Sequence, residues 1–175
     1  KSKHITGIDH ANIINILRDR LKKKNINLIS GDFLKHDFKY KKYDKIILYS
    51  VLHVFENKIQ VYRVINKALT LLKSGGIFLI GDLPNISLKK KFLRSKSGKN
   101  FENKWNKSNK KKFEDIKAQK ILKKNSIYKI KIDDEFIINL VKYFRKKGYN
   151  AYIFPQKKDL PFGHTREDII VEHIK

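Results

Sequence analysis

The stretch that decides the fold is Leu72-Lys73-Ser74-Gly75-Gly76-Ile77-Phe78-Leu79-Ile80. Its last four residues, 77–80, are all apolar, as expected of a strand that is covered on both faces of a sheet. Apolar residues precede it at helical spacing, namely Val61, Ile65, Ala68, Leu69 and Leu72. We therefore expect a helix over 58–72, with Asn57 as its N-cap and Gly75-Gly76 as its break, followed by a buried strand.

The same alternation of strands and helices extends to both sides of this unit. The upstream pattern predicts strands at 4–9, 27–30 and 45–48 and a helix at 11–24. The downstream pattern predicts a helix at 134–147, ended by Gly148, and a strand pair at 151–154 and 168–171. Such alternation predicts one α/β domain over 1–175, with a mainly parallel, doubly wound sheet and helices on both faces. Ligands of such sheets bind at the carboxyl ends of the strands.

The middle of the chain has a different composition. Residues 87–131 are rich in Lys, Asn and Ser, with isolated Phe92, Leu93, Phe101, Trp105 and Phe113. This segment is too apolar for a free linker and too polar for a central strand. We expect a partly helical insertion that covers the acceptor site as a lid.

The charge of the chain is strongly positive. Its 175 residues hold 41 basic and 17 acidic side chains, for a net charge of +24. Such a field attracts nucleic acid, yet almost all of the basic residues are Lys, whereas nucleic-acid interfaces favour Arg. Both a compositional and a nucleic-acid-binding origin of the charge stay open. With no cysteine, no secretory pattern and no apolar run of membrane-spanning length, we expect a cytoplasmic location.

Two acidic residues come at the ends of successive predicted strands. Asp9 ends the first strand, and Asp32 follows the second in Gly31-Asp32-Phe33. One strand–helix–strand unit separates them, so both carboxylates should lie at the same edge of the sheet. A carboxylate there can accept the ribose hydroxyls or the adenine amino group of a nucleoside cofactor, or it can cap the next turn.

An ordered series of short motifs runs along the chain. The series comprises Thr6-Gly7-Ile8-Asp9, Gly31-Asp32, Tyr43-Asp44-Lys45-Ile46-Ile47 leading into Ser50-Val51-Leu52-His53, and Leu72-Lys73-Ser74-Gly75-Gly76. It resembles that of class I, Rossmann-like methyltransferases that use S-adenosylmethionine (SAM). The resemblance implies SAM as cofactor and an antiparallel last strand. It also implies that the chain starts ahead of the family's second strand and lacks the first strand with its glycine-rich loop.

The resemblance also assigns roles to residues near the strand ends. The cofactor would lie against Asp9, His10, Asp32, Phe33, Tyr49 and Ser50. His53 would be the base for a hydroxyl acceptor, although it could equally be a packed histidine. The acceptor would lie near Asp82, Asn85, Gln156 and Arg166, with His164 at its entrance. Alternatively, 82–85 is a plain turn, and Arg166 pairs with Glu167 or Asp168.

Three functions are compatible with these residues. The first is methyl transfer from SAM to a small-molecule or sugar hydroxyl. The second is methylation of RNA or another nucleic acid, or plain nucleic-acid binding, on the same fold. The third is a nicotinamide-dependent Rossmann protein, which the Leu-Lys-Ser-Gly-Gly motif disfavours. No Asp or His spacing resembles a metal site, so we expect no metal.

Overall fold

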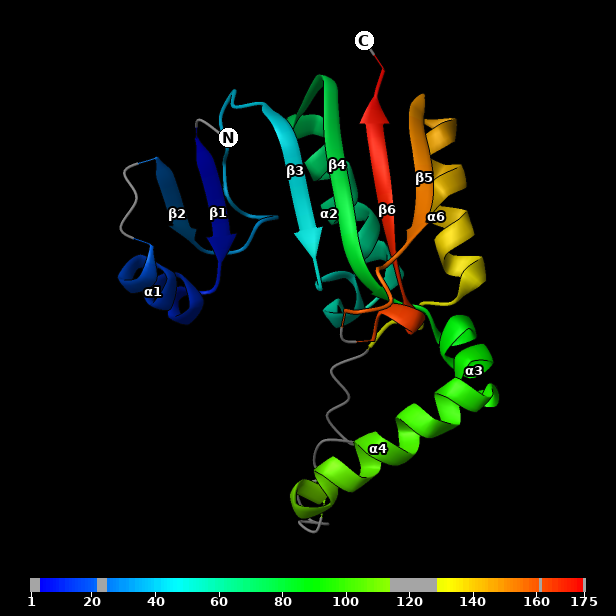
Figure 1. The fold of residues 1–175 in the computed structure, drawn as a ribbon. Coiled ribbons are helices and arrows are strands. Elements are labelled where there is room, and N and C mark those ends of the chain that lie inside the picture. Colours follow the sequence, from blue (N-terminus) through cyan, green and yellow to red (C-terminus); the bar gives the residue numbers. More distant parts are fainter. Residues whose placement is uncertain (1–3, 22–24, 114–128, 161, 175) are drawn as a thin grey trace.

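The computed structural model describes residues 4–21, 25–113, 129–160 and 162–174 of the chain. Strands and helices alternate along it in an α/β fold (Figure 1). The elements are β1 (Ile5–Asp9), α1 (Ala11–Arg20), β2 (Ile26–Ser30), β3 (Tyr43–Tyr49), η1 (Leu52–Val54), α2 (Lys58–Leu71), β4 (Leu72–Pro84), α3 (Ile86–Arg94), α4 (Lys96–Phe113), α6 (Asp134–Lys146), β5 (Tyr149–Pro155), η2 (Gly163–Thr165) and β6 (Arg166–His173). The predicted fold class is confirmed: the sheet is mostly parallel, and its last strand is antiparallel.

The strands form two groups. β1 and β2 pair in parallel, and the other strands form a sheet in the order β3-β4-β6-β5. β3 and β4 are parallel, whereas β6 runs antiparallel to both of its neighbours, β4 and β5. The carboxyl ends of β1 to β5 therefore lie along one edge, the lower edge in Figure 1, and β6 starts there. This edge is where an α/β sheet binds its ligands.

One face of the four-stranded sheet carries the hydrophobic core. Both α2 and α6 pack on this face, against Phe78 and Ile80 of β4 and Ile169 and Val171 of β6. These side chains share a face because Phe78 pairs with Val171 and Ile80 with Ile169 across the strands. All four are fully buried, and burying one such side chain stabilises the fold by about 1.5–3 kcal/mol.

The opposite face of the same sheet exposes several apolar side chains. Ile47 of β3 is 68% exposed, and Tyr152 and Phe154 of β5 are 41% and 45% exposed. They share this face because they alternate in register with the core residues. In the described part of the chain, α2 and α6 both cover the core face and leave this face to solvent, so the expectation of helices on both faces is wrong for the four-stranded sheet.

The helix before the deciding stretch ends earlier than predicted. Asn57 caps α2 as expected, since its side-chain oxygen accepts the amide of Gln60 at 2.9 Å. The helix stops before Leu72, which already has extended backbone angles. Gly75 and Gly76 therefore do not break the helix but lie inside β4. Gly75 has a φ of 71°, and a Cβ on Gly76 would lie 2.8 Å from a backbone carbonyl, so this bend needs glycine.

The predicted insertion, 87–131, is helical over most of its described part. α3 and α4 follow β4 at the carboxyl edge of the sheet, and α4 extends away from it (Figure 1). Residues 114–128 of the insertion lie outside the described residues. Its action as a lid stays a prediction.

Candidate active site

Two residues with left-handed backbone mark the carboxyl ends of β3 and β4. Ser50 has a φ of 56° and Asp82 a φ of 59°. Residues other than glycine rarely adopt this conformation, which often accompanies functional sites. The Ser50 hydroxyl donates to the Asp82 carboxylate, and the Ser50 amide donates to the Gly81 carbonyl at 3.1 Å. These bonds hold the two strand ends together.

A hydrogen-bond network connects Asp82 to the last strand. The Asp82 amide donates to the Asp168 carboxylate at 2.8 Å, and the Gln156 side chain donates to that carboxylate at 3.0 Å and to the Tyr49 hydroxyl at 3.1 Å. Arg166 Nε lies 3.5 Å from Asp82 Oδ1, and Arg166 Nη1 donates to the Asp82 carbonyl at 3.3 Å. The structure thus brings Tyr49, Asp82, Gln156 and Arg166 together, as expected of residues around one site.

The ring of Tyr49 lies over a glycine of the neighbouring strand. β3 and β4 pair at Tyr49 and Gly81. A Cβ on Gly81 would lie 2.6 Å from Tyr49 Cε2, so a larger residue would displace the ring. Tyr49 is 49% exposed, which leaves part of its ring open to a ligand at this edge.

His53 lies in η1, just past Ser50, and is 7% exposed. Burial lowers the pKa of its imidazole below the ordinary value of 6.5, and the positive charge of Arg166 lowers it further, whereas Asp82 opposes this shift. A histidine with a lowered pKa is neutral near pH 7 and can accept a proton. Among the predicted site residues, His53 therefore has the electrostatics of a base.

Asn85 has a supporting position. Its side-chain oxygen caps α3 by accepting the amides of Ser87 at 2.8 Å and Leu88 at 3.2 Å. Its amide group donates to Asp134 and to Glu167, both at 2.7 Å. With its polar atoms occupied and 1% of its surface exposed, Asn85 ties the start of the insertion to α6 and β6.

The predicted cofactor carboxylates lie at the carboxyl ends of β1 and β2. Each accepts one local amide, Asp9 from His10 and Asp32 from Leu34, both at 2.7 Å. Both side chains are exposed at this edge. Phe33, in contrast, packs partly against the core, and Lys67 Nζ lies 5.5 Å from its ring centroid.

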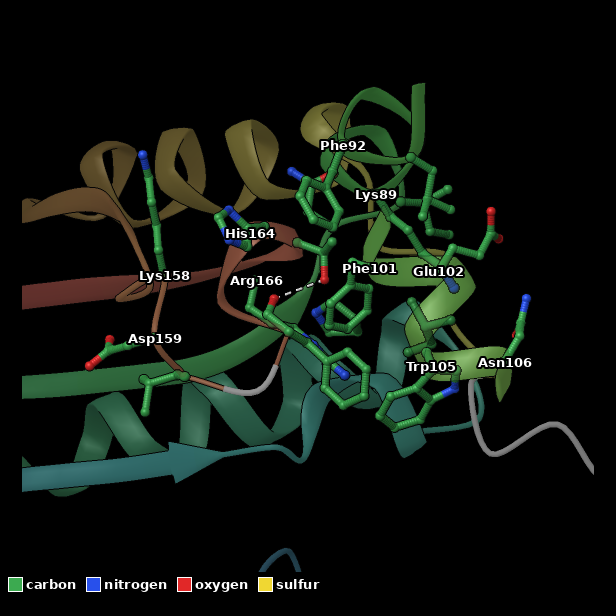
Figure 2. A pocket seen from close by; sticks show the side chains of 18 residues that line it. Lys89, Phe92, Phe101, Glu102, Trp105, Asn106, Lys158, Asp159, His164 and Arg166 are labelled. Atoms are coloured by element: carbon green, nitrogen blue, oxygen red, sulfur yellow. Dashed lines mark hydrogen bonds between the residues drawn. The ribbon is translucent and has the colours of Figure 1, made fainter. Parts of the chain in front are cut away.

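A cavity of about 660 Å³ opens between the end of β4, the insertion and the loop before β6 (Figure 2). Of the residues expected near the acceptor, Asn85, His164 and Arg166 line this cavity, whereas Asp82 and Gln156 are not among its lining residues. Its wall also includes Phe92, Leu93, Phe101 and Trp105 of α3 and α4, which the sequence placed in the insertion without assigning them to a cavity wall. The sequence interpretation missed Leu160 and Phe162 of the loop before β6.

The described residues hold neither a metal cluster nor a membrane helix. Within the part of the chain that the structure describes, no three His, Asp or Glu side chains gather in a way that could hold a metal ion. No described helix combines the length and apolarity needed to cross a bilayer. The absence of a metal and the cytoplasmic location stay predictions.

A family model described as a methyltransferase domain matches residues 1–130. The chain belongs to this family. The predicted resemblance to class I methyltransferases is therefore confirmed, and the protein is a SAM-dependent methyltransferase by family. A comparison with curated proteins found no match.

Several methyltransferases of known structure share this fold. The N-methyltransferase NodS of Bradyrhizobium japonicum WM9, in complex with S-adenosylhomocysteine (SAH), has a TM-score of 0.61 at 14% identity, over 99% of this chain and 68% of that one. The plantazolicin methyltransferase BpumL in complex with SAH has a TM-score of 0.64 at 16% identity, over 98% and 67%. The methyltransferase domain of bacterial CtHen1-C has a TM-score of 0.63 at 15% identity, over 99% and 78%. At such identities the likeness shows the fold alone.

The residues at the cofactor edge fit the nucleoside part of SAM. A carboxylate accepts several hydrogen bonds, so Asp9 and Asp32 retain acceptor capacity beyond their one local amide. Hydroxyl and amino groups of a nucleoside are donors of the matching kind. The printed sequence contains no Gly-x-Gly, the kind of glycine-rich loop that the family resemblance implies.

Proposed function

We propose that this methyltransferase domain transfers the methyl group of SAM to a hydroxyl of a small-molecule or sugar acceptor, with His53 as the base. The observation that carries the proposal is the buried imidazole of His53, whose pKa is lowered, beside the Ser50–Asp82 pair. SAM supplies a methyl group on a sulfonium, which is already activated for attack. The protein must then position the two reactants and remove one proton.

Each polar residue of the site has a role in this proposal. Asp9 accepts the ribose hydroxyls of the cofactor, and Asp32 accepts its adenine amino group; His10, Phe33 and Tyr49 border the cofactor. Ser50 and Asp82 fix the ends of β3 and β4 through their mutual bond. Gln156 orients the Tyr49 hydroxyl, and Asn85 holds the insertion in place.

His53 accepts the acceptor's proton as the new carbon–oxygen bond forms and the carbon–sulfur bond breaks. Its Nδ1 is buried inside the protein, so we assign proton acceptance to Nε2. Arg166 lines the cavity and also lies against Asp82, and the charges of both residues act on the imidazole of His53. Burial and, next to it, the positive charge of Arg166 lower the pKa of this imidazole, which favours the neutral form that accepts a proton.

The test uses protein expressed from its complete reading frame, SAM with a tritiated methyl group, and a panel of hydroxyl-bearing acceptors. We expect His53→Ala to lower kcat by about 10²- to 10⁴-fold, the usual cost of losing a general base, without a change in SAM affinity. His4→Ala is the matched control, because His4 is exposed ahead of β1, at the opposite edge of the sheet. A loss below about threefold, with chemistry rate-limiting, would leave His53 a packing residue.

A further inference from the structure

Rings from two distant parts of the chain form the walls of the 660 Å³ cavity. α3 and α4 contribute Phe92, Phe101 and Trp105, and the loop before β6 contributes Phe162 and His164. Figure 2 shows the labelled rings of Phe92, Phe101 and Trp105 directed from the insertion toward the segment that carries His164.

Several of these rings lie face to face. Phe92 and His164 are stacked, with centroids 4.6 Å apart and planes 4° apart. Phe101 and Trp105 are stacked at 6.1 Å and 19°. Phe162 meets Trp105 edge-on, with centroids 5.3 Å apart. The wall is thus a set of pre-arranged flat surfaces.

These rings do more than attach the insertion to the sheet. Rings that served only as a small core would be buried, yet Phe101 is 39%, Trp105 43% and Phe162 39% exposed. Their open surface borders the cavity. Flat, partly exposed aromatic surfaces around a concave space are typical of small-molecule sites, whose volumes are about 300–1,000 Å³.

The charge of the cavity differs from that of the chain. The cavity is lined by Lys89 and Lys158 and also by Glu102 and Asp159, and its Arg166 lies against Asp82. Its charges therefore nearly balance, although the whole chain has a net charge of +24. A polyanion would instead require an excess of cations along its path. This balance favours a ligand with little net charge.

We propose that the cavity binds the methyl acceptor through a planar aromatic or heteroaromatic ring, held against Phe101 and Trp105. The inference deepens the proposed function and rests on it, since the ring would be part of the acceptor. Aromatic rings stack on one another in offset or edge-to-face arrangements, with a gain beyond area burial that a saturated ring lacks. The acceptor hydroxyl would then be a substituent of that ring.

The test measures binding alone, without SAM, on protein from the complete reading frame. The probes are 2-naphthol and its saturated counterpart decahydro-2-naphthol, which match in carbon skeleton and differ in their π-system. Saturation-transfer NMR gives the affinity of each. We expect 2-naphthol to bind about fivefold tighter or more, and Phe101→Leu or Trp105→Leu to weaken it by about 3- to 10-fold.

The control variant is Phe154→Leu, which removes a ring of similar exposure from the open sheet face, outside the cavity. It should leave 2-naphthol affinity within about twofold, whereas an equal loss would show nonspecific apolar binding. Thermal unfolding checks that each variant folds. We expect both cavity variants to fold, because Phe101 and Trp105 are partly exposed. Equal binding of the two probes would overturn the inference. So would tighter, Trp105-dependent binding of methyl β-glucoside, which has no aromatic ring.

The experiment distinguishes a failure of the aromatic-acceptor inference from a failure of the proposed methyl transfer. If the protein binds 2-naphthol through Phe101 and Trp105 but transfers no methyl group to any hydroxyl, the proposed reaction is wrong and the aromatic binding site remains. Protein that transfers methyl groups, yet fails to distinguish 2-naphthol from its saturated counterpart, would overturn only the aromatic acceptor.

Discussion

At the scale of single residues, Asp9 gives the most direct test of the cofactor site. We expect Asp9→Asn in the complete protein to weaken SAM binding by about 10- to 100-fold, because hydrogen bonds to a charged acceptor contribute about 1.5–3 kcal/mol. Isothermal calorimetry measures this affinity. Asp37→Asn is the matched control, since the Asp37 carboxylate makes a similar local bond, to the Lys39 amide at 2.7 Å. Unchanged SAM affinity in the Asp9 variant would remove this carboxylate from the cofactor site.

The lowered pKa of His53 predicts two pH dependences with a common origin. The rate should rise with pH through this pKa and be level by pH 7, because burial and Arg166 hold the pKa below 6.5. Stability should fall as pH drops from about 6.5 to that lower pKa, because the unfolded imidazole then binds the proton that the folded one excludes.

His53→Gln should flatten both profiles. The measurements are kcat against pH and the free energy of unfolding against pH, each for the wild type and the variant. A rate that keeps rising well above pH 7 would contradict the lowered pKa.

At the scale of elements, the N-cap of α6 should make a measurable contribution to the free energy of unfolding. The Asp133 carboxylate accepts the amide of Phe136 at 3.1 Å, and it pairs with Lys131 at 2.6 Å, which lowers the pKa of Asp133 below 3.8. Asp133→Ala should destabilise the protein by about 1 kcal/mol, the usual cost of losing such a cap. Urea unfolding at pH 7 measures it. Lys142→Ala, an exposed change in the same helix, should stay within about 0.5 kcal/mol of the wild type.

The elements with strong apolar periodicity were the predictable part of the fold. The helix expected at 134–147 is α6 at Asp134–Lys146, and the strand expected at 27–30 is β2 at Ile26–Ser30. The deciding stretch was less predictable in detail. Its two glycines were predicted to break the helix, yet they lie in β4. The helix ends before them because Leu72 already has extended backbone angles and begins the strand.

The candidate site divides in the same way. Strand-end position predicted that Tyr49 and Asp82 would lie at one edge, because the topology of an α/β sheet brings strand ends together. Gln156 and Arg166 were expected there because the family resemblance implies an antiparallel last strand. The contacts between the rings of the cavity wall could not be predicted from the sequence, because Trp105 and Phe162 meet only through long-range packing of the insertion on the loop before β6. The left-handed backbone at Asp82 likewise depends on contacts across three strands.

At the scale of the whole molecule, the exposed face of the four-stranded sheet predicts how residues 1–175 behave by themselves. Ile47 and Tyr152 lie on this face, opposite the core, with 68% and 41% of their surfaces exposed. Contiguous apolar surface of this kind binds apolar dyes and promotes self-association. We expect the polypeptide 1–175 to enhance the fluorescence of Nile red. This dye is neutral, so the net charge of +24 should affect its binding little. Ile47→Glu with Tyr152→Glu should abolish most of this signal without lowering the melting temperature, because neither side chain contributes to the core.

Ile59→Glu is the control: Ile59 is 73% exposed but lies on α2, away from the open face, so its substitution should leave the dye signal intact. If the double variant binds Nile red as strongly as the wild type, the open sheet face is not the apolar surface that the chain presents to solvent.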